Sequence, residues 1–358
     1  MIPRMRPIRC RHSLVALLIA CALLAGAPPA AQGQAPDASI RIGLVTDIGQ
    51  VDDRSFNQSA WEGALIAADA LGGTADFVET VDPADYPTNL RLFADQGYAI
   101  IVTTGAAISE AVIETARQYP DTHFIAVDAD IEGTLEAQGL LPADVPNVTG
   151  LIFPEDQAGF LAGVLAARMT RSGRVAAVLP TDQLEPVVNF ANGFASGIRY
   201  TNPAVQLLSS FHPGGLAVAF EDPVWGAQMA AQAIDQGADV IFAGGGKTGN
   251  GGLQEVARRT TPEDPLYCIG VDTDQWYVVP EAQPCLLTSA IKRIREGVEL
   301  LVMAAAAGEI APGNFRGEVG LAPFHDFETV VPQEVMFELE AVERDLRNGL
   351  LRTDGTRP

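Results

Sequence analysis

Residues 40–63 read IRIGLVTDIGQVDDRSFNQSAWEG and combine the signals of a strand, a loop and a helix. The apolar run 40–45 predicts a buried strand, which Asp47 brings to an end. A glycine-containing acidic loop follows. One of its adjacent acids, Asp52 or Asp53, is expected to cap the next helix, because a carboxylate accepts hydrogen bonds from free helix amides. A strand that leads into a helix in this way is the building unit of α/β proteins.

Strand-like runs alternate with helix-like patterns along the chain, which is typical of parallel βαβ units. The predicted strands are 40–46, 75–80, 99–103, 122–127, 148–153, 174–179, 205–210, 239–243, 266–271 and 286–290. The predicted helices include 57–71, 108–118, 157–169, 187–200, 225–236, 252–259, 292–307 and 332–348. The break after Pro154 divides the strands into two sets, and a chain of 358 residues usually forms two domains. We therefore predict an α/β protein with two doubly wound lobes.

The first 36 residues have the pattern of an export signal, in which arginines precede a short apolar run. This run, 14–24, is too short to span a membrane stably. Two cleavage sites compete. Residues 18–21, Leu-Ile-Ala-Cys, resemble a lipobox that would leave Cys21 lipidated, whereas 31–33, Ala-Gln-Gly, would release a soluble protein. Both alternatives place the mature protein outside the cytoplasm.

The charge of the mature chain restricts its partners. Removal of the signal takes away four arginines and no acids, which leaves 19 basic and 45 acidic side chains and a net charge of −26. Such a surface repels nucleic acid and anionic lipid, and it disfavours a phosphorylated ligand. The four histidines show no metal-ligand spacing, so no metal site is predicted. Cys268 and Cys285 each come just before a strand-like run, 269–271 and 286–288, and they form either a disulfide or two buried thiols.

Asp47 and Asp128 each follow a predicted strand, at the sheet edge where open α/β proteins bind ligands. They form either an acid/base pair or a set of acceptors for ligand hydroxyl and amino groups. The sequence has neither a Gly-x-Ser-x-Gly motif nor a Cys/His pair, which favours binding over catalysis. Phe56 either fixes the first helix to the core or faces the cleft. In the cleft, Phe56 would stack on a flat base, and Asn57 would pair with the base edge.

A glycine run, 244–249, lies between a predicted strand and a helix. It formally fits the Gly-x-Gly-x-x-Gly pattern of dinucleotide-binding proteins, but it opens a late βα unit. A secreted NAD-type oxidoreductase is therefore an alternative from a different functional class. The run does not fit a Walker phosphate loop. We therefore expect only that the backbone approaches a ligand closely at Gly246, where no side chain is in the way.

Three further residues fit the same predicted crevice. Asp272 ends a strand as Asp47 does, and Lys292 begins the next predicted helix. Lys292 is either a solvated side chain or, beside Asp272, a donor to a ribose oxygen. The ring of Phe220 lies either in the core or in the cleft.

These motifs together resemble the basic membrane protein family, the PnrA-like purine-nucleoside substrate-binding lipoproteins of ABC transporters. The resemblance covers essentially the whole mature chain, in order. It rests on Asp47-Ile48-Gly49, Asp52-Asp53-Arg54-Ser55-Phe56-Asn57-Gln58, Trp61-Glu62-Gly63, Gly159-Phe160-Leu161-Ala162-Gly163, Phe190 to Gly197, Gly237-Ala238-Asp239-Val240, Gly270-Val271-Asp272-Thr273-Asp274-Gln275 and Thr288-Ser289-Ala290-Ile291-Lys292-Arg293. It implies a type I periplasmic-binding-protein fold, with two lobes joined by three crossovers that act as a hinge.

The resemblance also implies roles for the candidate residues. Phe56 and Phe220 would sandwich the nucleobase, and Asn57 and Asp128 would bind its edge. The ribose would be held by Asp47, Asp272 and Lys292, and Gly246 would let the backbone approach. The segment 210–219 looks longer than usual, which leaves Phe211 as an alternative to Phe220. Gln50 replaces a usual glycine.

The sequence therefore predicts a non-enzymatic, exported binding protein for a purine nucleoside such as adenosine, guanosine or inosine, without a cofactor. The alternative is the same fold with another small polar solute, such as a sugar or a signalling molecule. The implied partners are an ABC permease and its ATPase, with a monomeric binding protein and membrane contact only through a lipid anchor. We assign 38–154 and 285–310 to the first lobe, and 155–284 and 311–350 to the second.

Overall fold

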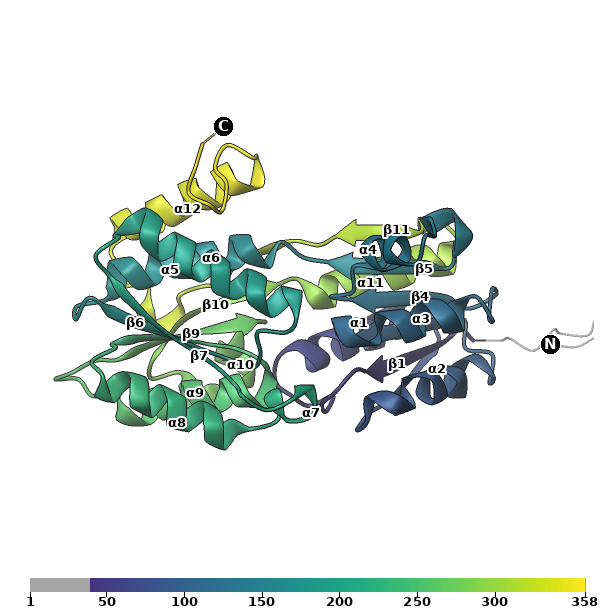
Figure 1. Ribbon diagram of the computed structural model, residues 1–358, viewed down its shortest axis with the longest axis horizontal. Coiled ribbons are helices and arrows are strands. Elements are labelled where there is room, and N and C mark those ends of the chain that lie inside the picture. Colours follow the sequence, from purple (N-terminus) through teal and green to yellow (C-terminus); the bar gives the residue numbers. More distant parts are fainter. Residues whose placement is uncertain (1–38, 358) are drawn as a thin grey trace, which may run out of the picture. The chain divides into compact units, whose positions relative to one another are not determined.

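The computed structural model describes residues 39–357 as two six-stranded sheets, each covered by helices on both faces (Figure 1). The first sheet has the order β11-β5-β4-β3-β1-β2, and all its strands are parallel. Its strands are β1 (Arg41–Thr46), β2 (Thr74–Val78), β3 (Ile100–Thr104), β4 (His123–Val127), β5 (Val148–Ile152) and β11 (Gly313–Arg316).

The second sheet has the order β12-β10-β9-β8-β6-β7, in which only the short β12 runs antiparallel to its neighbour. Its strands are β6 (Arg174–Leu179), β7 (Gln206–Phe211), β8 (Val240–Ala243), β9 (Tyr267–Asp272), β10 (Leu286–Lys292) and β12 (Val319–Leu321). The predicted α/β class with two doubly wound lobes is confirmed.

The strands of the first sheet are apolar on both sides because helices cover both of its faces. Alternate residues of β1 point to opposite faces, so that Ile42 and Leu44 pack in one core and Val45 in the other. The first core lies under α1 (Phe56–Ala70) and α11 (Ile294–Ala307). The second core lies under α2 (Tyr86–Ala94), α3 (Ser109–Ala116) and α4 (Ile131–Ala137).

Two helices of the second lobe approach each other at backbone distance. They are α5 (Glu155–Met169) and α6 (Glu185–Thr201), and glycines line their contact. A Cβ atom at Gly159 or Gly163 would overlap a carbonyl oxygen of α6, and one at Gly193 or Gly197 would overlap a carbonyl oxygen of α5. The motifs 159–163 and 190–197 of the sequence analysis are thus explained by helix packing.

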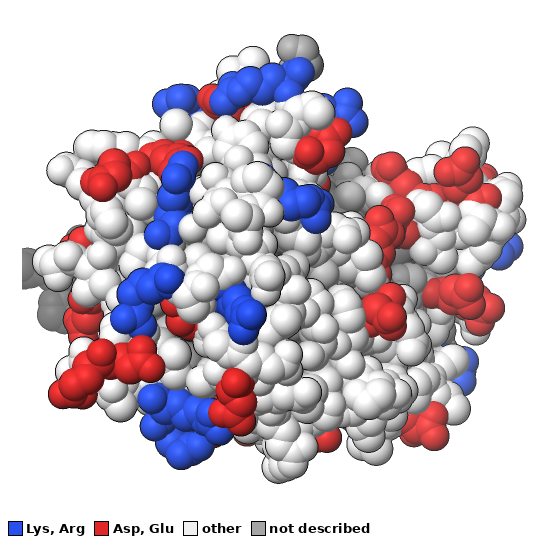
Figure 2. All heavy atoms as spheres, turned by 60° about the vertical axis from the view of Figure 1, so that its left-hand side comes forward, with Lys and Arg blue, Asp and Glu red and all other residues white. Residues whose placement is uncertain are grey.

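The other helices of the second lobe complete its two layers. They are α7 (Leu216–Ala219), α8 (Pro223–Asp235), α9 (Gly246–Arg259), α10 (Gln275–Val278) and α12 (Gln333–Arg347). On the face shown in Figure 2, basic and acidic side chains are interspersed. Exposed ion pairs such as Arg168–Glu338, 2.8 Å apart, bring opposite charges together. None of the helices in residues 39–357 has the length and apolar character that a membrane crossing requires.

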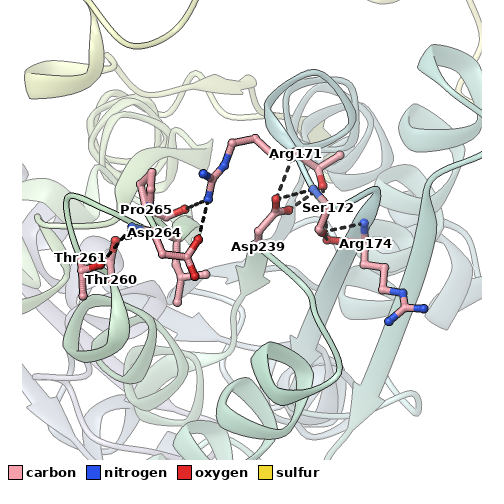
Figure 3. A network of polar contacts seen from close by, with 10 residues as sticks. Arg171, Ser172, Arg174, Asp239, Thr260, Thr261, Asp264 and Pro265 are labelled. Atoms are coloured by element: carbon pink, nitrogen blue, oxygen red, sulfur yellow. Dashed lines mark hydrogen bonds and ion pairs between the residues drawn. The ribbon is translucent and has the colours of Figure 1, made fainter.

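Asp239, a buried acid just before β8, holds the turn between α5 and β6 in the second lobe (Figure 3). Asp239 accepts hydrogen bonds from the Thr170 hydroxyl at 2.5 Å and from the backbone amides of Arg171 and Ser172 at 2.7 Å. The Arg171 guanidinium donates to the Asp264 carboxylate at 3.1 Å. The acid in the motif Gly237-Ala238-Asp239-Val240 therefore has a structural role, because it anchors this turn.

Three segments connect the lobes: β5 to α5, β10 to α11, and β11 to β12. They pack together, because the Gly317 amide donates to the Ile152 carbonyl at 2.8 Å and the Arg293 amide donates to the Glu318 carbonyl at 2.9 Å. The three crossovers implied by the resemblance are therefore present.

The C-terminal part of the chain is divided differently from the expected lobe boundaries. Residues 286–292 form β10 in the second sheet, whereas the assignment of 285–310 placed them in the first lobe. Conversely, β11 belongs to the first sheet, although 311–350 was assigned to the second lobe. The reason is that β11, Gly-Asn-Phe-Arg, carries almost no apolar signal and pairs with β5 only after the chain has crossed back.

Cys268 and Cys285 are joined by a disulfide with a Cα–Cα distance of 5.1 Å. They lie at the start of the neighbouring strands β9 and β10, where Leu286 pairs with Cys268. The predicted signal segment 1–36, including Cys21, lies outside the described residues.

Candidate functional site

A cavity lies where the carboxyl ends of the strands of the two sheets face each other. Its empty space, open mouth included, is about 770 Å³. It is lined by Asp47, Ile48, Asp53, Phe56, Asn57, Gly105, Ala106, Asp128, Leu179, Pro180, Leu184, Pro186, Val187, Phe190, Phe220, Glu221, Gly244, Gly245, Gly246, Val271, Asp272 and Lys292. All eight residues predicted to bind ligand are therefore brought together.

Two strand ends supply the acids of the first lobe. Asp47 follows β1 and Asp128 follows β4, and β3 lies between these two strands. Gly105 follows β3 and fills the gap. A Cβ atom there would overlap the Asp47 carboxylate, so glycine makes the room that this carboxylate occupies.

The amino end of α1 carries Phe56 and Asn57 into the cavity. Asp53 accepts hydrogen bonds from the backbone amides of Ser55, Asn57 and Gln58 at 2.8, 2.9 and 3.1 Å, which confirms the predicted cap. On the side chain of Asn57, Oδ1 accepts a hydrogen bond from the Thr104 hydroxyl at 2.6 Å.

The second lobe supplies Phe220 and a glycine run. Phe220 follows α7 and lines the cavity, whereas Phe211 ends β7 and packs against the core of the lobe. Gly246 has a φ of 56°, and a Cβ atom there would lie 3.1 Å from the Phe220 carbonyl oxygen. The helix α9 begins at Gly246 and not at Gly252, since glycine-rich sequence hides the helical pattern.

Lys292 is the last residue of β10, not the first of the following helix. Its ammonium group donates to Asp128 Oδ2 and lies 3.7 Å from Asp272 Oδ1 and 3.8 Å from Glu155 Oε1. It also lies 4.8 Å from the centre of the Phe56 ring. Lys292 thus joins one carboxylate of the first lobe with two of the second, since Glu155 is the first residue of α5.

Carboxyl groups outnumber ammonium groups in this site. Burial raises the pKa of Asp47 and of Asp53 to about 7, and burial raises the pKa of Glu155 to about 8. Burial alone would lower the pKa of Lys292, but Asp128, Asp272 and Glu155 outweigh it and raise this pKa. The site therefore keeps Lys292 charged and favours a proton on some of its acids.

Two of the acids have an unusual backbone conformation. Asp128 has a φ of 60° and Asp272 a φ of 67°, in the left-handed region that residues with a side chain rarely adopt. Such strain is found mostly where a side chain must be held in a functional position. The two residues end corresponding strands of the two lobes.

Hydrogen bonds join the lobes around the cavity. The Ser55 hydroxyl donates to Asp272 Oδ2 at 2.7 Å, and Asn250 Nδ2 donates to the Asp53 carbonyl at 2.8 Å. Gln275 Nε2 donates to Asn250 Oδ1, also at 2.8 Å. The two lobes are therefore closed on each other.

Sequence reasoning missed several residues of the site. Phe190, with Leu184, Pro186 and Val187, forms an apolar wall from α6 and the loop before it. Glu155 follows the first crossover and contacts Lys292, and Ser55 bridges the lobes. The position of Glu155 after a strand end was the available signal, since the same rule identified Asp47 and Asp128.

Two parallel-sheet lobes, three crossovers and a cavity at the facing strand ends define the type I periplasmic-binding-protein fold. Solved structures with this fold agree. The ABC transporter system solute-binding protein from Aeropyrum pernix K1 matches with a TM-score of 0.76 and 22% identity, covering 87% of this chain and 92% of that chain. A solute-binding protein from Conexibacter woesei matches with a TM-score of 0.67 and 23% identity, covering 87% and 98%.

The chain belongs to the family described as ABC transporter substrate-binding protein PnrA-like, which it matches over residues 40–321. The resemblance inferred from the motifs is thereby confirmed. The chain is 31% identical over 325 residues to the CD4+ T-cell-stimulating antigen of Listeria monocytogenes, covering 86% of each. It is 28% identical over 246 residues to the ABC transporter nucleoside-binding protein BmpA of Lactococcus lactis, covering 67% of this chain and 65% of that protein.

Proposed function

We propose that this substrate-binding protein captures a purine nucleoside for an ABC importer. The observation that carries the proposal is the presence of two aromatic rings from opposite lobes, Phe56 and Phe220, in one cavity with carboxylate and amide groups. Aromatic rings stack on the faces of a base, and amides and carboxylates recognise its edge. The nucleoside-binding name of the Lactococcus lactis relative points in the same direction.

Asn57 and Asp128 are proposed to bind the base edge. Asp128 Oδ2 contacts Lys292, but its Oδ1 is buried without a hydrogen-bond partner among the described residues. A buried acceptor without a donor is costly, so a ring or amino N–H of the ligand would stabilise it.

Asp47, Asp272 and Lys292 are proposed to hold the ribose. The two carboxylates accept hydrogen bonds from ribose hydroxyl groups, and the Lys292 ammonium donates to a ribose oxygen. The three side chains together therefore fit a sugar, which offers both donors and acceptors. The lining contains the acids Asp47, Asp53, Asp128, Asp272 and Glu221 against Lys292 alone, which disfavours a phosphorylated ligand.

The protein is proposed to act outside the cytoplasm, where it delivers the nucleoside to a permease driven by an ATPase. It is either anchored through Cys21 or released after residues 31–33. Mass spectrometry of the native N-terminus distinguishes a lipidated Cys21 from an unmodified N-terminus.

Calorimetry of the purified protein with adenosine, guanosine, inosine and galactose tests the proposal. A nucleoside is expected to bind, and Phe56→Ala should weaken binding by about 1–3 kcal/mol through the lost stacking. Phe77→Ala is the matched control, because Phe77 is 46% exposed and does not line the cavity. Binding of galactose without any nucleoside would refute the proposal.

A further inference from the structure

We infer that Gln50 and Lys247 are positioning residues that join the two lobes beside the cavity and orient Asn57. The inference rests on the proposed function, because it concerns how the same site holds its ligand. Neither Gln50 nor Lys247 lines the cavity, so both act through other residues.

The first step is the orientation of the Asn57 side chain. Its Nδ2 donates to the Gln50 carbonyl at 3.3 Å, and its Oδ1 accepts from the Thr104 hydroxyl at 2.6 Å. A carbonyl only accepts hydrogen bonds, so the backbone of Gln50 determines which end of the amide is the nitrogen. Asn57 is buried, and its amide cannot turn freely while both contacts hold.

The second step is the contact of Gln50 with the other lobe. The Lys247 ammonium, in the first turn of α9, donates to Gln50 Oε1 and lies 3.1 Å from Glu221 Oε2. The loop of the first lobe is held on a second side as well. A Cβ atom at Gly49 would lie 3.0 Å from Glu221 Oε1, so the Glu221 carboxylate packs on this part of the loop.

The third step is the chemistry of the two positions. A glycine at position 50 would keep the backbone carbonyl but lack the amide that accepts from Lys247. The glycine run that formally fits the Gly-x-Gly-x-x-Gly pattern therefore has another use here, because it carries the Lys247 cation to the opposite lobe. Since Lys247 and Gln50 come from different lobes, their contact exists only when the lobes are closed.

The expected consequence is slower release of the ligand. Gln50 is exposed and the Lys247 side chain is 29% exposed. Contacts of this kind are weak, so Gln50→Ala and Lys247→Ala should each raise the dissociation rate of the nucleoside by roughly 2- to 5-fold. The association rate should change little, because the contact forms only after closure.

Stopped-flow measurement of association and dissociation tests this with four variants and one control variant. The double variant Gln50→Ala/Lys247→Ala should dissociate no faster than Lys247→Ala alone, because that variant already removes the contact with Gln50. Lys247→Arg keeps a donor and should restore slow dissociation. Gln58→Ala is the control, because its side chain donates to Glu62 within α1 and does not bridge the lobes. Additive single effects, or unchanged dissociation rates, would overturn the inference.

A second measurement separates this inference from the proposed function. Hydrogen exchange of the ligand-free protein reports on the loop 48–52 directly. Lys247→Ala should increase exchange in this loop even if no nucleoside binds at all. Unchanged exchange there would overturn the bridge, whereas absent nucleoside binding alone would overturn only the proposed function.

Discussion

At the scale of single residues, the site is defined by an imbalance of charge. Lys292 faces Asp128, Asp272 and Glu155 at once, and Asp47 and Asp53 lie in the same cavity wall. Carboxylates that share a buried space cannot all ionise without cost. Burial is the main cause of the raised pKa values of Asp47, Asp53 and Glu155, and neighbouring carboxylates raise them further.

The pKa of Asp47 leads to a prediction about stability and pH. Burial raises this pKa from 3.8 to about 7, so the folded protein holds a proton that the unfolded chain has lost between these values. The folded state therefore loses stability as the pH rises through this window, and above about pH 7 the loss is complete.

Asp47→Asn removes this effect. It should raise the melting temperature of the ligand-free protein by about 2–4 °C at a pH near 8, which corresponds to roughly 1 kcal/mol. At a pH near 4, close to the ordinary pKa of 3.8, the increase should be much smaller, because only a small part of the loss has occurred there. Calorimetric scans at both pH values decide the matter, and equal shifts at the two would contradict the explanation.

Most of the site residues could be predicted one by one from the sequence. Asp47, Asp128 and Asp272 each follow an apolar strand, and Phe56 and Asn57 open the first helix. Their partners could not be predicted. That Lys292 reaches Asp128 of the other lobe depends on a crossover, and local sequence does not report a contact over 164 positions.

At the scale of elements, helix packing decides where the second lobe presents its cavity wall. The four glycines between α5 and α6 allow backbone contact, and Phe190 and Glu155 lie at the cavity end of these helices. Helix ends depend on such contacts. Sequence pattern located β6 at its observed bounds, but it placed the start of α9 at residue 252 instead of Gly246.

Gly197→Ala tests this packing. Alanine is favoured over glycine within a helix, but its Cβ would overlap the Phe160 carbonyl oxygen, so backbone must move. We expect a net loss of about 1–3 kcal/mol of unfolding free energy, as for other overpacked positions. Gly215→Ala is the control, since a Cβ there meets nothing within 4 Å. Urea unfolding measures both, and equal stabilities would contradict the role of close packing.

At the scale of the whole molecule, closure of the lobes assembles the site. Asn250 is central to this closure because it is buried and connects Asp53 of the first lobe with Gln275 of the second. Either lobe alone has only part of the lining, so the affinity for ligand and the equilibrium between open and closed forms are coupled.

Asn250→Ala should therefore favour the open form. Loss of these buried hydrogen bonds is expected to cost about 1–2 kcal/mol of binding free energy, roughly a 5- to 30-fold weaker affinity. Small-angle scattering should show a larger radius of gyration in the ligand-free variant. Asn89→Ala is the control, since its bond to Thr80 lies within the first lobe. A weaker affinity without a change in scattering would argue against this role.

The sequence by itself determined the alternation of strands and helices, the two-lobed class and the strand-end acids, because these follow from local periodicity and from short motifs. Only the tertiary structure decided that β10 lies in the second sheet and β11 in the first. Only it showed that Phe220, and not Phe211, faces the cavity, and that Gln50 meets Lys247. The physical reason is that crossovers and lobe closure bring together residues far apart in the chain, and such contacts leave no periodic signal in the sequence around residues 40–63.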